Sequence, residues 1–183
     1  MTAATDLNVA LLQADLVWQD PAANRRLLAE QVAGAAASDL LVLPETFSTG
    51  FTLAAAANAE PADGPTSQWL LELASRHQVD ICGSVIVAED GRHYNRLLWA
   101  TRHGDLLHYD KRHLFRMADE HRHFSPGQER LIVQLGEWRI CPMICYDLRF
   151  PVWSRNCDDY DLLLYVANWP QARHSAWTAL LPA

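Results

Sequence analysis

Residues 79–101 decide how this chain folds. They read Val-Asp-Ile-Cys-Gly-Ser-Val-Ile-Val, then Ala-Glu-Asp-Gly-Arg-His, then Tyr-Asn-Arg-Leu-Leu-Trp-Ala-Thr. The apolar run 79–87 predicts a buried strand, and 94–101 predicts a second one. Asp90 and Gly91 between them are typical of a tight hairpin turn. The middle of the chain is therefore expected to be an antiparallel pair of strands.

Toward the N-terminus, strand and helix patterns alternate. The apolar runs 7–14 and 39–43 predict strands, the first of them buried, and the stretches 21–37 and 64–77 have helical character. Asp20-Pro21 supplies a helix cap followed by a first-turn proline. This alternation is typical of a sheet with parallel strands covered by helices.

Toward the C-terminus, strands follow one another with fewer helices. We expect strands at 105–110, 130–135, 138–144 and 161–167 (the last one buried), a loop over 112–129, and a helix over 172–181. The expected fold class is α/β with a mixed sheet. The whole chain, residues 1–183, is expected to form a single domain.

Composition excludes several classes of protein. Of the 183 residues, 50% are hydrophobic and 20% are charged, as in globular proteins. The net charge of −7 without a basic patch argues against a nucleic-acid partner. The sequence has no apolar run of about 18 residues, so we expect no membrane partner. The polar start of the chain and its four cysteines predict a cytoplasmic protein with reduced thiols.

The first candidate for chemistry is Glu45, in the stretch Leu43-Pro44-Glu45-Thr46-Phe47. A carboxylate directly after a buried strand and a proline is expected at the edge of an apolar site. Burial there would raise its pKa and suit it to general-base work. The alternative is that Glu45 only caps a turn or a helix.

The second candidate is Lys111, which is the one Lys among 15 Lys and Arg residues. Arg would serve equally well on a solvated face, so a retained Lys indicates a site that needs a compact point charge. Chance is the alternative for a single residue.

The third candidate is Cys145, where the predicted strand 138–144 runs into a turn. Such a junction resembles a nucleophile elbow, which lifts a side chain out of the sheet. A neighbouring ammonium would lower the thiol pKa and favour the thiolate. Cys82, Cys141 and Cys157 are interpreted as small buried hydrophobic residues.

Together, Glu45, Lys111 and Cys145 supply a base, a cation and a nucleophile. These are the groups that acyl transfer at a carbon–nitrogen bond requires. The motifs around them resemble the nitrilase superfamily of carbon–nitrogen hydrolases, whose signature is a Glu-Lys-Cys triad. The resemblance implies a four-layer α-β-β-α sandwich with mixed sheets, in a domain longer than 183 residues, so this chain is expected to be incomplete at its C-terminus.

The resemblance adds further residues and partners. A second family Glu precedes a Pro-Gly, which places Glu120 in the catalytic set ahead of Pro126-Gly127, with Asp119 as the alternative. The superfamily usually dimerises, so a homodimer is expected of the full-length domain.

Within the superfamily, Glu-Thr-Phe-Ser-Thr-Gly-Phe, Lys-Arg-His-Leu-Phe-Arg-Met-Ala and Ala-Asn-Trp-Pro resemble the omega-amidase branch. This implies a small amide substrate with a distal carboxylate, such as 2-oxoglutaramate or succinamate. Arg149 is the candidate partner of that carboxylate, unless it forms a structural pair with Asp147 or another acid. The residues expected to wall the pocket are Phe47, Phe51, Phe115, Tyr146 and Trp169.

Two other interpretations stay open. The chain could be another amidase of the superfamily, such as the deaminated-glutathione type, or an inactive fragment that only binds or assembles. No cofactor motif occurs and the mechanism requires none. His121 and His123 could seed a metal site, but solvated loop histidines explain them better, so no metal is expected.

Overall fold

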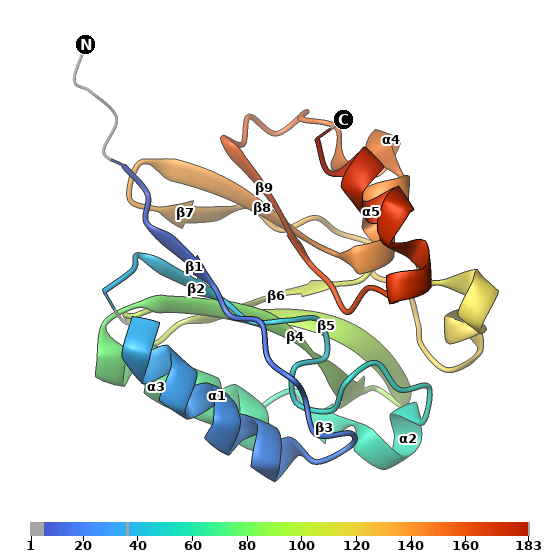
Figure 1. The fold of residues 1–183 in the computed structure, drawn as a ribbon, viewed down its shortest axis with the longest axis horizontal. Coiled ribbons are helices and arrows are strands. Elements are labelled where there is room, and N and C mark those ends of the chain that lie inside the picture. Colours follow the sequence, from blue (N-terminus) through green and yellow to red (C-terminus); the bar gives the residue numbers. More distant parts are fainter. Residues whose placement is uncertain (1–5, 36, 183) are drawn as a thin grey trace.

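The computed structural model describes residues 6–35 and 37–182, and two sheets form its centre (Figure 1). The larger sheet has six strands in the order β1-β2-β4-β5-β6, with β3 paired to β4. Its strands are β1 (Val9–Leu11), β2 (Leu40–Val42), β3 (Glu60–Pro61), β4 (Asp80–Glu89), β5 (Arg92–Ala100) and β6 (Leu106–Asp110). The β1-β2-β4 part is parallel, and the β4-β5-β6 part is antiparallel.

The smaller sheet has the order β7-β8-β9. Its strands are β7 (Val133–Leu135), β8 (Trp138–Ile144) and β9 (Leu162–Val166). β7 pairs with β8 antiparallel, and β9 pairs with β8 parallel. Both sheets are therefore mixed, which confirms the expected α/β class.

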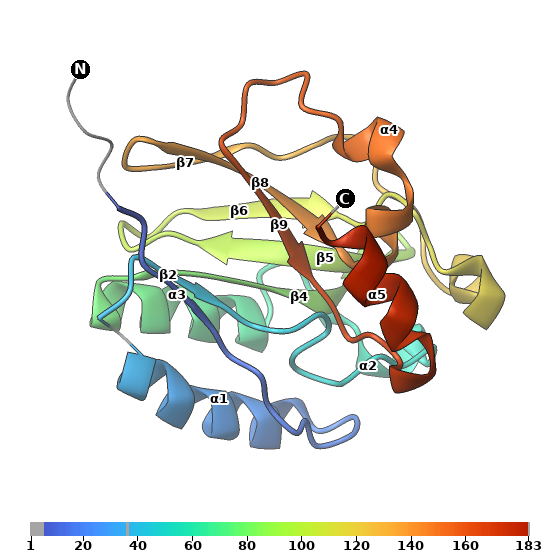
Figure 2. The same ribbon diagram turned by 45° about the horizontal axis from the view of Figure 1, so that its top comes forward.

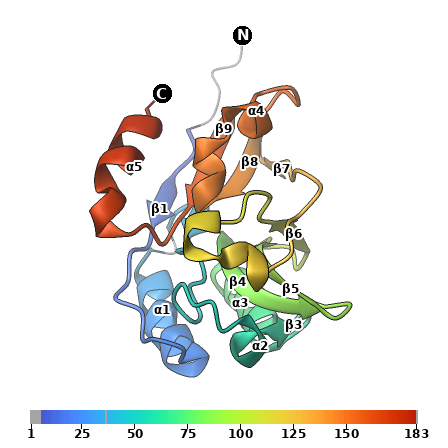
Figure 3. The same ribbon diagram turned by 90° about the vertical axis from the view of Figure 1, so that its right-hand side faces the viewer.

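The helices and the two sheets are stacked in layers, because each sheet buries an apolar face against its neighbour. Helices α1 (Pro21–Ala35) and α3 (Pro65–His77) cover one face of the larger sheet, and the smaller sheet packs on its other face (Figure 2). One apolar cluster includes Leu28, Leu70 and Ile81 under the helices, and a second joins Trp99 to Met143 between the sheets. Helix α5 (His174–Leu180) follows β9 and lies beside the smaller sheet (Figure 3). The short helices are α2 (Ala55–Asn58) and α4 (Pro151–Ser154).

Local sequence signals place several of these elements. The Asp20 carboxylate accepts a 2.9 Å hydrogen bond from the Ala23 N–H and caps α1 as expected. The predicted hairpin turn is confirmed, because Asp90 and Gly91 join β4 to β5 with φ angles of 49° and 73°. No helix in the described ranges is both long and apolar enough to cross a bilayer.

Three expectations about burial are wrong or only partly right. The predicted buried strand 7–14 is the short edge strand β1, where Leu11 is 72% exposed because β1 has a single neighbouring strand. β9 also lies at an edge and is only partly buried. Cys157 is exposed, because it lies in the loop between α4 and β9.

Candidate active site

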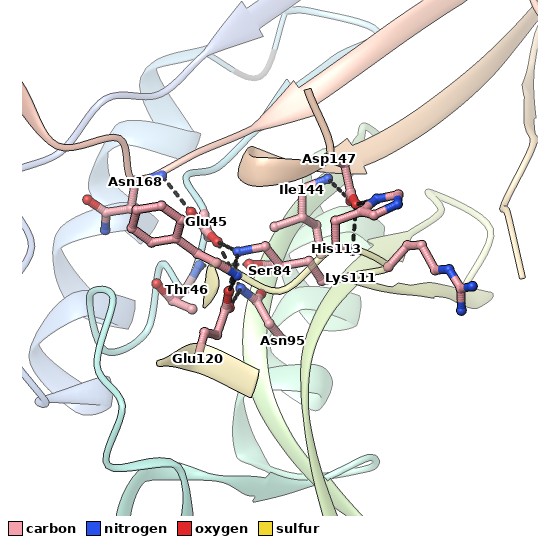
Figure 4. A network of polar contacts seen from close by, with 12 residues as sticks. Glu45, Thr46, Ser84, Asn95, Lys111, His113, Glu120, Ile144, Asp147 and Asn168 are labelled. Atoms are coloured by element: carbon pink, nitrogen blue, oxygen red, sulfur yellow. Dashed lines mark hydrogen bonds and ion pairs between the residues drawn. The ribbon is translucent and has the colours of Figure 1, made fainter. Parts of the chain in front are cut away.

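The three residues of the predicted catalytic triad each lie just after the end of a strand. Glu45 follows β2, Lys111 follows β6, and Cys145 follows β8 of the other sheet. Because the two sheets pack face to face, these ends meet at one end of the molecule, where Glu45 and Lys111 point toward each other (Figure 4). The sequence predicted each strand end, and the packing of the sheets brings them together.

The turn that carries Glu45 is held against β4. The Phe47 N–H donates to the Ser84 carbonyl at 2.9 Å, and the Thr46 N–H donates to the Ser84 hydroxyl at 2.8 Å. Gly83 makes this close approach possible, since a Cβ there would lie 2.7 Å from the Cβ of Leu43. The turn also places Thr46 at a φ of 45°, and such strained backbone is common at functional sites.

The Lys111 ammonium bridges two buried carboxylates. Its Nζ lies 2.8 Å from Glu45 Oε1, and 3.0 and 3.1 Å from the two carboxylate oxygens of Glu120. All three side chains are at most 1% exposed. Burial alone would lower the pKa of Lys111, but the Glu45 and Glu120 carboxylates outweigh it and hold that pKa above its ordinary value. Lys111 is therefore a fixed ammonium.

Two asparagines that the sequence analysis missed orient Glu45. Asn95 on β5 donates from Nδ2 to Glu45 Oε1 at 2.8 Å, and the backbone N–H of Asn168 donates to Oε2 at 2.9 Å. The available signals were an amide in the predicted strand 94–101 and the position of Asn168 just after β9. Neither signal by itself names Glu45 as the partner, because the residues are far apart in the sequence.

The loop 112–129 brings Glu120 to Lys111. It contains two short 3-10 helices, Arg116–Ala118 and Glu120–Arg122, and Asp119 joins them with a φ of 59°. The Phe115 N–H also donates to Glu120, and burial, opposed by Lys111, raises the pKa of Glu120. The alternative residue, Asp119, is exposed and pairs with Arg122.

Cys145 begins the 3-10 helix Cys145–Arg149, with a φ of 46°. The strand-to-turn junction predicted for it is therefore present. Two residues on, the buried carboxylate of Asp147 accepts hydrogen bonds from the Ile144 N–H at 3.1 Å and the His113 N–H at 2.9 Å. These contacts hold the turn on both sides of Cys145.

Lys111 lowers the pKa of the Cys145 thiol, as expected, but other groups outweigh it. Burial and the Glu45 carboxylate raise the pKa of Cys145 well above its ordinary value, and Lys111 lowers it only in part. The Glu120 carboxylate, which is paired with Lys111, raises that pKa as well. The resting site therefore holds a thiol beside a carboxylate that can accept its proton.

A narrow cavity of about 30 Å³ reaches Cys145 and Lys111. Its remaining walls are Phe51, Phe115, Tyr146, Arg149, Asn168, Trp169, Pro170 and Arg173. Phe51, Phe115, Tyr146, Arg149 and Trp169 were expected there, and Arg173 was not. The structure places Phe47 elsewhere: it is fully buried under α3, where its ring packs against Trp69, so it leaves the candidate set.

Arg149 does not form the alternative pair with Asp147. The Asp147 carboxylate is occupied by Tyr109, His113 and Ile144, and the Arg149 guanidinium carbon lies 5.9 Å from the ring centre of Trp169. Within residues 6–35 and 37–182, no cluster of three His, Cys, Asp or Glu side chains could hold a metal ion.

Comparison with known proteins identifies the family. The model of the carbon-nitrogen hydrolase family matches residues 8–182. This chain belongs to the carbon-nitrogen hydrolase family. The membership confirms the expected enzyme class, hydrolases that cleave amide bonds, and the resemblance to the nitrilase superfamily.

Two curated relatives and one solved structure support the assignment. Omega-amidase YafV of Escherichia coli K12 is 49% identical over 97% of this chain and 69% of its own length. The 2-oxoglutaramate amidase of Bacillus subtilis 168 is 38% identical over 80% of this chain and 58% of its own length. The crystal structure of XC1258 from Xanthomonas campestris, a CN-hydrolase superfamily protein, superposes on this carbon-nitrogen hydrolase with a TM-score of 0.91 and 48% sequence identity. The match covers 97% of this chain and 70% of the XC1258 chain.

Proposed function

We propose that this carbon-nitrogen hydrolase releases ammonia from the terminal amide of a dicarboxylate monoamide, such as 2-oxoglutaramate or succinamate. The observation that carries the proposal is the Lys111 ammonium held between Glu45 and Glu120 beneath the cavity that Cys145 lines. The names of the omega-amidase and 2-oxoglutaramate amidase relatives support this substrate class.

In the first step, the Cys145 sulfur attacks the amide carbon and Glu45 takes the thiol proton. The carbonyl oxygen becomes an oxyanion, which Lys111 and a backbone N–H stabilise. An ammonium has three donors, and one directed to each carboxylate leaves the third for the oxyanion. Glu120 keeps Lys111 charged and in place. The carbon–nitrogen bond then breaks, and Glu45 passes the proton to the nitrogen, so that ammonia leaves and a thioester remains.

In the second step, water attacks the thioester carbon and Glu45 takes a proton from the water. The carbon–sulfur bond breaks, the acid product leaves, and the proton returns to the sulfur. The site is thereby restored without a cofactor. Arg149, at the wall of the same cavity, binds the distal carboxylate and orients the amide toward Cys145.

The test measures ammonia release from 2-oxoglutaramate and succinamate by the purified chain. Cys145→Ala is expected to abolish release, because it removes the nucleophile, and to leave the fold intact, because the side chain is small and at a turn. Cys157→Ala, which removes an exposed thiol outside the site, is the matched control and is expected to be fully active.

Mass spectrometry of the quenched reaction is expected to show the acyl group on the peptide that contains Cys145. Undiminished release by Cys145→Ala would refute the thioester mechanism. Faster release from a peptide-like amide, as in the deaminated-glutathione type, would refute the proposed substrate class while leaving the mechanism in place.

A further inference from the structure

The cavity beside Cys145 has a cationic mouth made of two arginines. Arg149 comes from the 3-10 helix that begins with Cys145, and Arg173 comes from the segment that follows β9. Of the two, only Arg149 was expected at the site from the sequence. Both side chains line the cavity that contains Cys145 and Lys111.

Each guanidinium lies over an aromatic ring of the same cavity. The guanidinium carbon of Arg173 is 5.0 Å from the ring centre of Phe115, and that of Arg149 is 5.9 Å from the ring centre of Trp169. The Trp169 indole N–H also donates to the Arg173 carbonyl at 2.8 Å, which fixes the backbone that carries Arg173. A guanidinium held over a ring by cation–π attraction keeps its N–H edge available for a carboxylate.

No carboxylate in the described part of the chain forms an ion pair with either arginine. The further contact of the Arg173 guanidinium is with the Met117 sulfur, at 3.4 Å. The nearby carboxylates of Glu45 and Glu120 are fully buried and bound to Lys111. An anionic group that enters the cavity therefore meets two guanidinium groups that are not neutralised by an ion pair.

We propose that Arg173 is a specificity-determining residue that acts with Arg149 on the distal end of the substrate, and that the pair selects a 2-oxo acid over a plain carboxylic acid. The inference rests on the proposed amidase function. A 2-oxo acid presents a carboxylate and an adjacent carbonyl oxygen, which is one more acceptor than a single bidentate arginine can bind. The second guanidinium supplies the donor for that oxygen.

Three amides of equal chain length separate the contribution of the oxo group to binding from that of the carboxylate. They are 2-oxoglutaramate, glutaramate without the oxo group, and pentanamide without either acceptor. For Arg173→Met, kcat/KM is expected to fall by about tenfold to a hundredfold with 2-oxoglutaramate, mostly through KM, since a charged hydrogen-bonding partner is lost. The loss is expected to be smaller with glutaramate and absent with pentanamide. Arg173→Lys should restore part of the loss.

Arg116→Met is the matched control. It removes the same charge from an exposed site on the neighbouring loop, outside this cavity, and is expected to leave all three rates unchanged. Equal losses with all three amides would mean that Arg173 only shapes the cavity, and no loss would mean that it takes no part. Either result overturns the proposal, and equal losses with the two acids overturn the preference for a 2-oxo acid.

A binding experiment keeps the inference independent of turnover. Calorimetry measures the affinity of the Cys145→Ala protein for 2-oxoglutarate, with and without Arg173→Met. The second substitution is expected to weaken binding by about tenfold or more, and equal affinities would overturn the role of Arg173. If 2-oxoglutarate binds through Arg173 while no amide is hydrolysed, the proposed function fails and the recognition site remains.

Discussion

The hydroxyl of Tyr109 donates a 2.7 Å hydrogen bond to the buried carboxylate of Asp147, and this contact joins the two sheets at the active site. Tyr109 lies on β6, two residues before Lys111, and Asp147 follows Cys145 by two residues. The strand that carries the ammonium is thereby linked to the turn that carries the nucleophile. The contact sets the relative position of groups that the sequence places far apart.

Tyr109→Phe is expected to lower kcat by about tenfold, because a small displacement of the nucleophile from the ammonium is costly. The free energy of unfolding should fall by about 1.5–3 kcal/mol, the usual contribution of a hydrogen bond to a charged group. Steady-state kinetics and urea unfolding measure the two effects. Tyr94→Phe, on β5 outside the site, is the control. A loss of stability at full activity would show that the contact does not position the nucleophile.

Glu45→Gln is expected to separate the reactivity of the thiol from turnover. Turnover should fall by about 10² or more, because the general base is lost. The Glu45 carboxylate contributes to raising the pKa of Cys145, so its neutralisation should lower that pKa. The thiolate then forms at lower pH, and alkylation of Cys145 by iodoacetamide should reach its midpoint at lower pH than in the unmodified protein.

Mass spectrometry of the Cys145 peptide across a pH series follows this midpoint. Glu129→Gln, which neutralises an exposed carboxylate outside the cavity, should leave both the midpoint and turnover unchanged. A midpoint that stays in place or rises in Glu45→Gln would contradict the electrostatic coupling of Glu45 to the thiol.

Lys111→Met is expected to reduce turnover by about 10² through loss of the oxyanion donor. It should also reduce the free energy of unfolding by about 3–5 kcal/mol, because two buried carboxylates lose their counter-charge. The deficit in stability should shrink as the pH is lowered, since burial raises the pKa of Glu120 and its protonation removes one of the buried charges.

Adding Glu120→Gln to Lys111→Met tests this explanation by a double-mutant cycle. The pair should recover part of the lost stability in urea unfolding, because a single buried charge then remains, whereas turnover should stay low. If the second substitution makes the protein still less stable, the two buried carboxylates without a counter-charge are not the cause of the deficit.

Gly127→Ala is expected to destabilise the protein by about 1–3 kcal/mol and to lower turnover. The added Cβ would lie 2.2 Å from the carbonyl oxygen of Asp110, directly before Lys111, so the strand end must shift. Gly34→Ala on α1 has no atom within 4 Å and should instead stabilise the helix by about 0.5–1 kcal/mol. Thermal unfolding compares the two variants, and equal stabilities would argue against a steric role for Gly127.

Local sequence patterns were sufficient to predict most of the helices and strands. The helix Pro65–His77, the hairpin at Asp90-Gly91 and the strand Trp138–Ile144 follow from capping residues, turn residues and apolar runs that lie within each element. The positions of Glu45, Lys111 and Cys145 at strand ends follow in the same way. Such features depend on neighbours in the sequence, so they can be predicted without the structure.

Features that depend on contacts between distant segments follow only from the folded structure. Pairing within the larger sheet sets Asn95 on the carboxylate of Glu45, and packing of the smaller sheet adds Asn168. Packing of α3 on the larger sheet buries Phe47, and the segment after β9 brings Arg173 to the cavity beside Arg149. The fold also sets the protonation state of Cys145. Lys111 lowers the pKa of the thiol, but burial and the carboxylates that the fold brings beside it raise that pKa by more. Charge balance in a buried site is a sum over every group that the fold gathers there, which no single stretch of sequence contains.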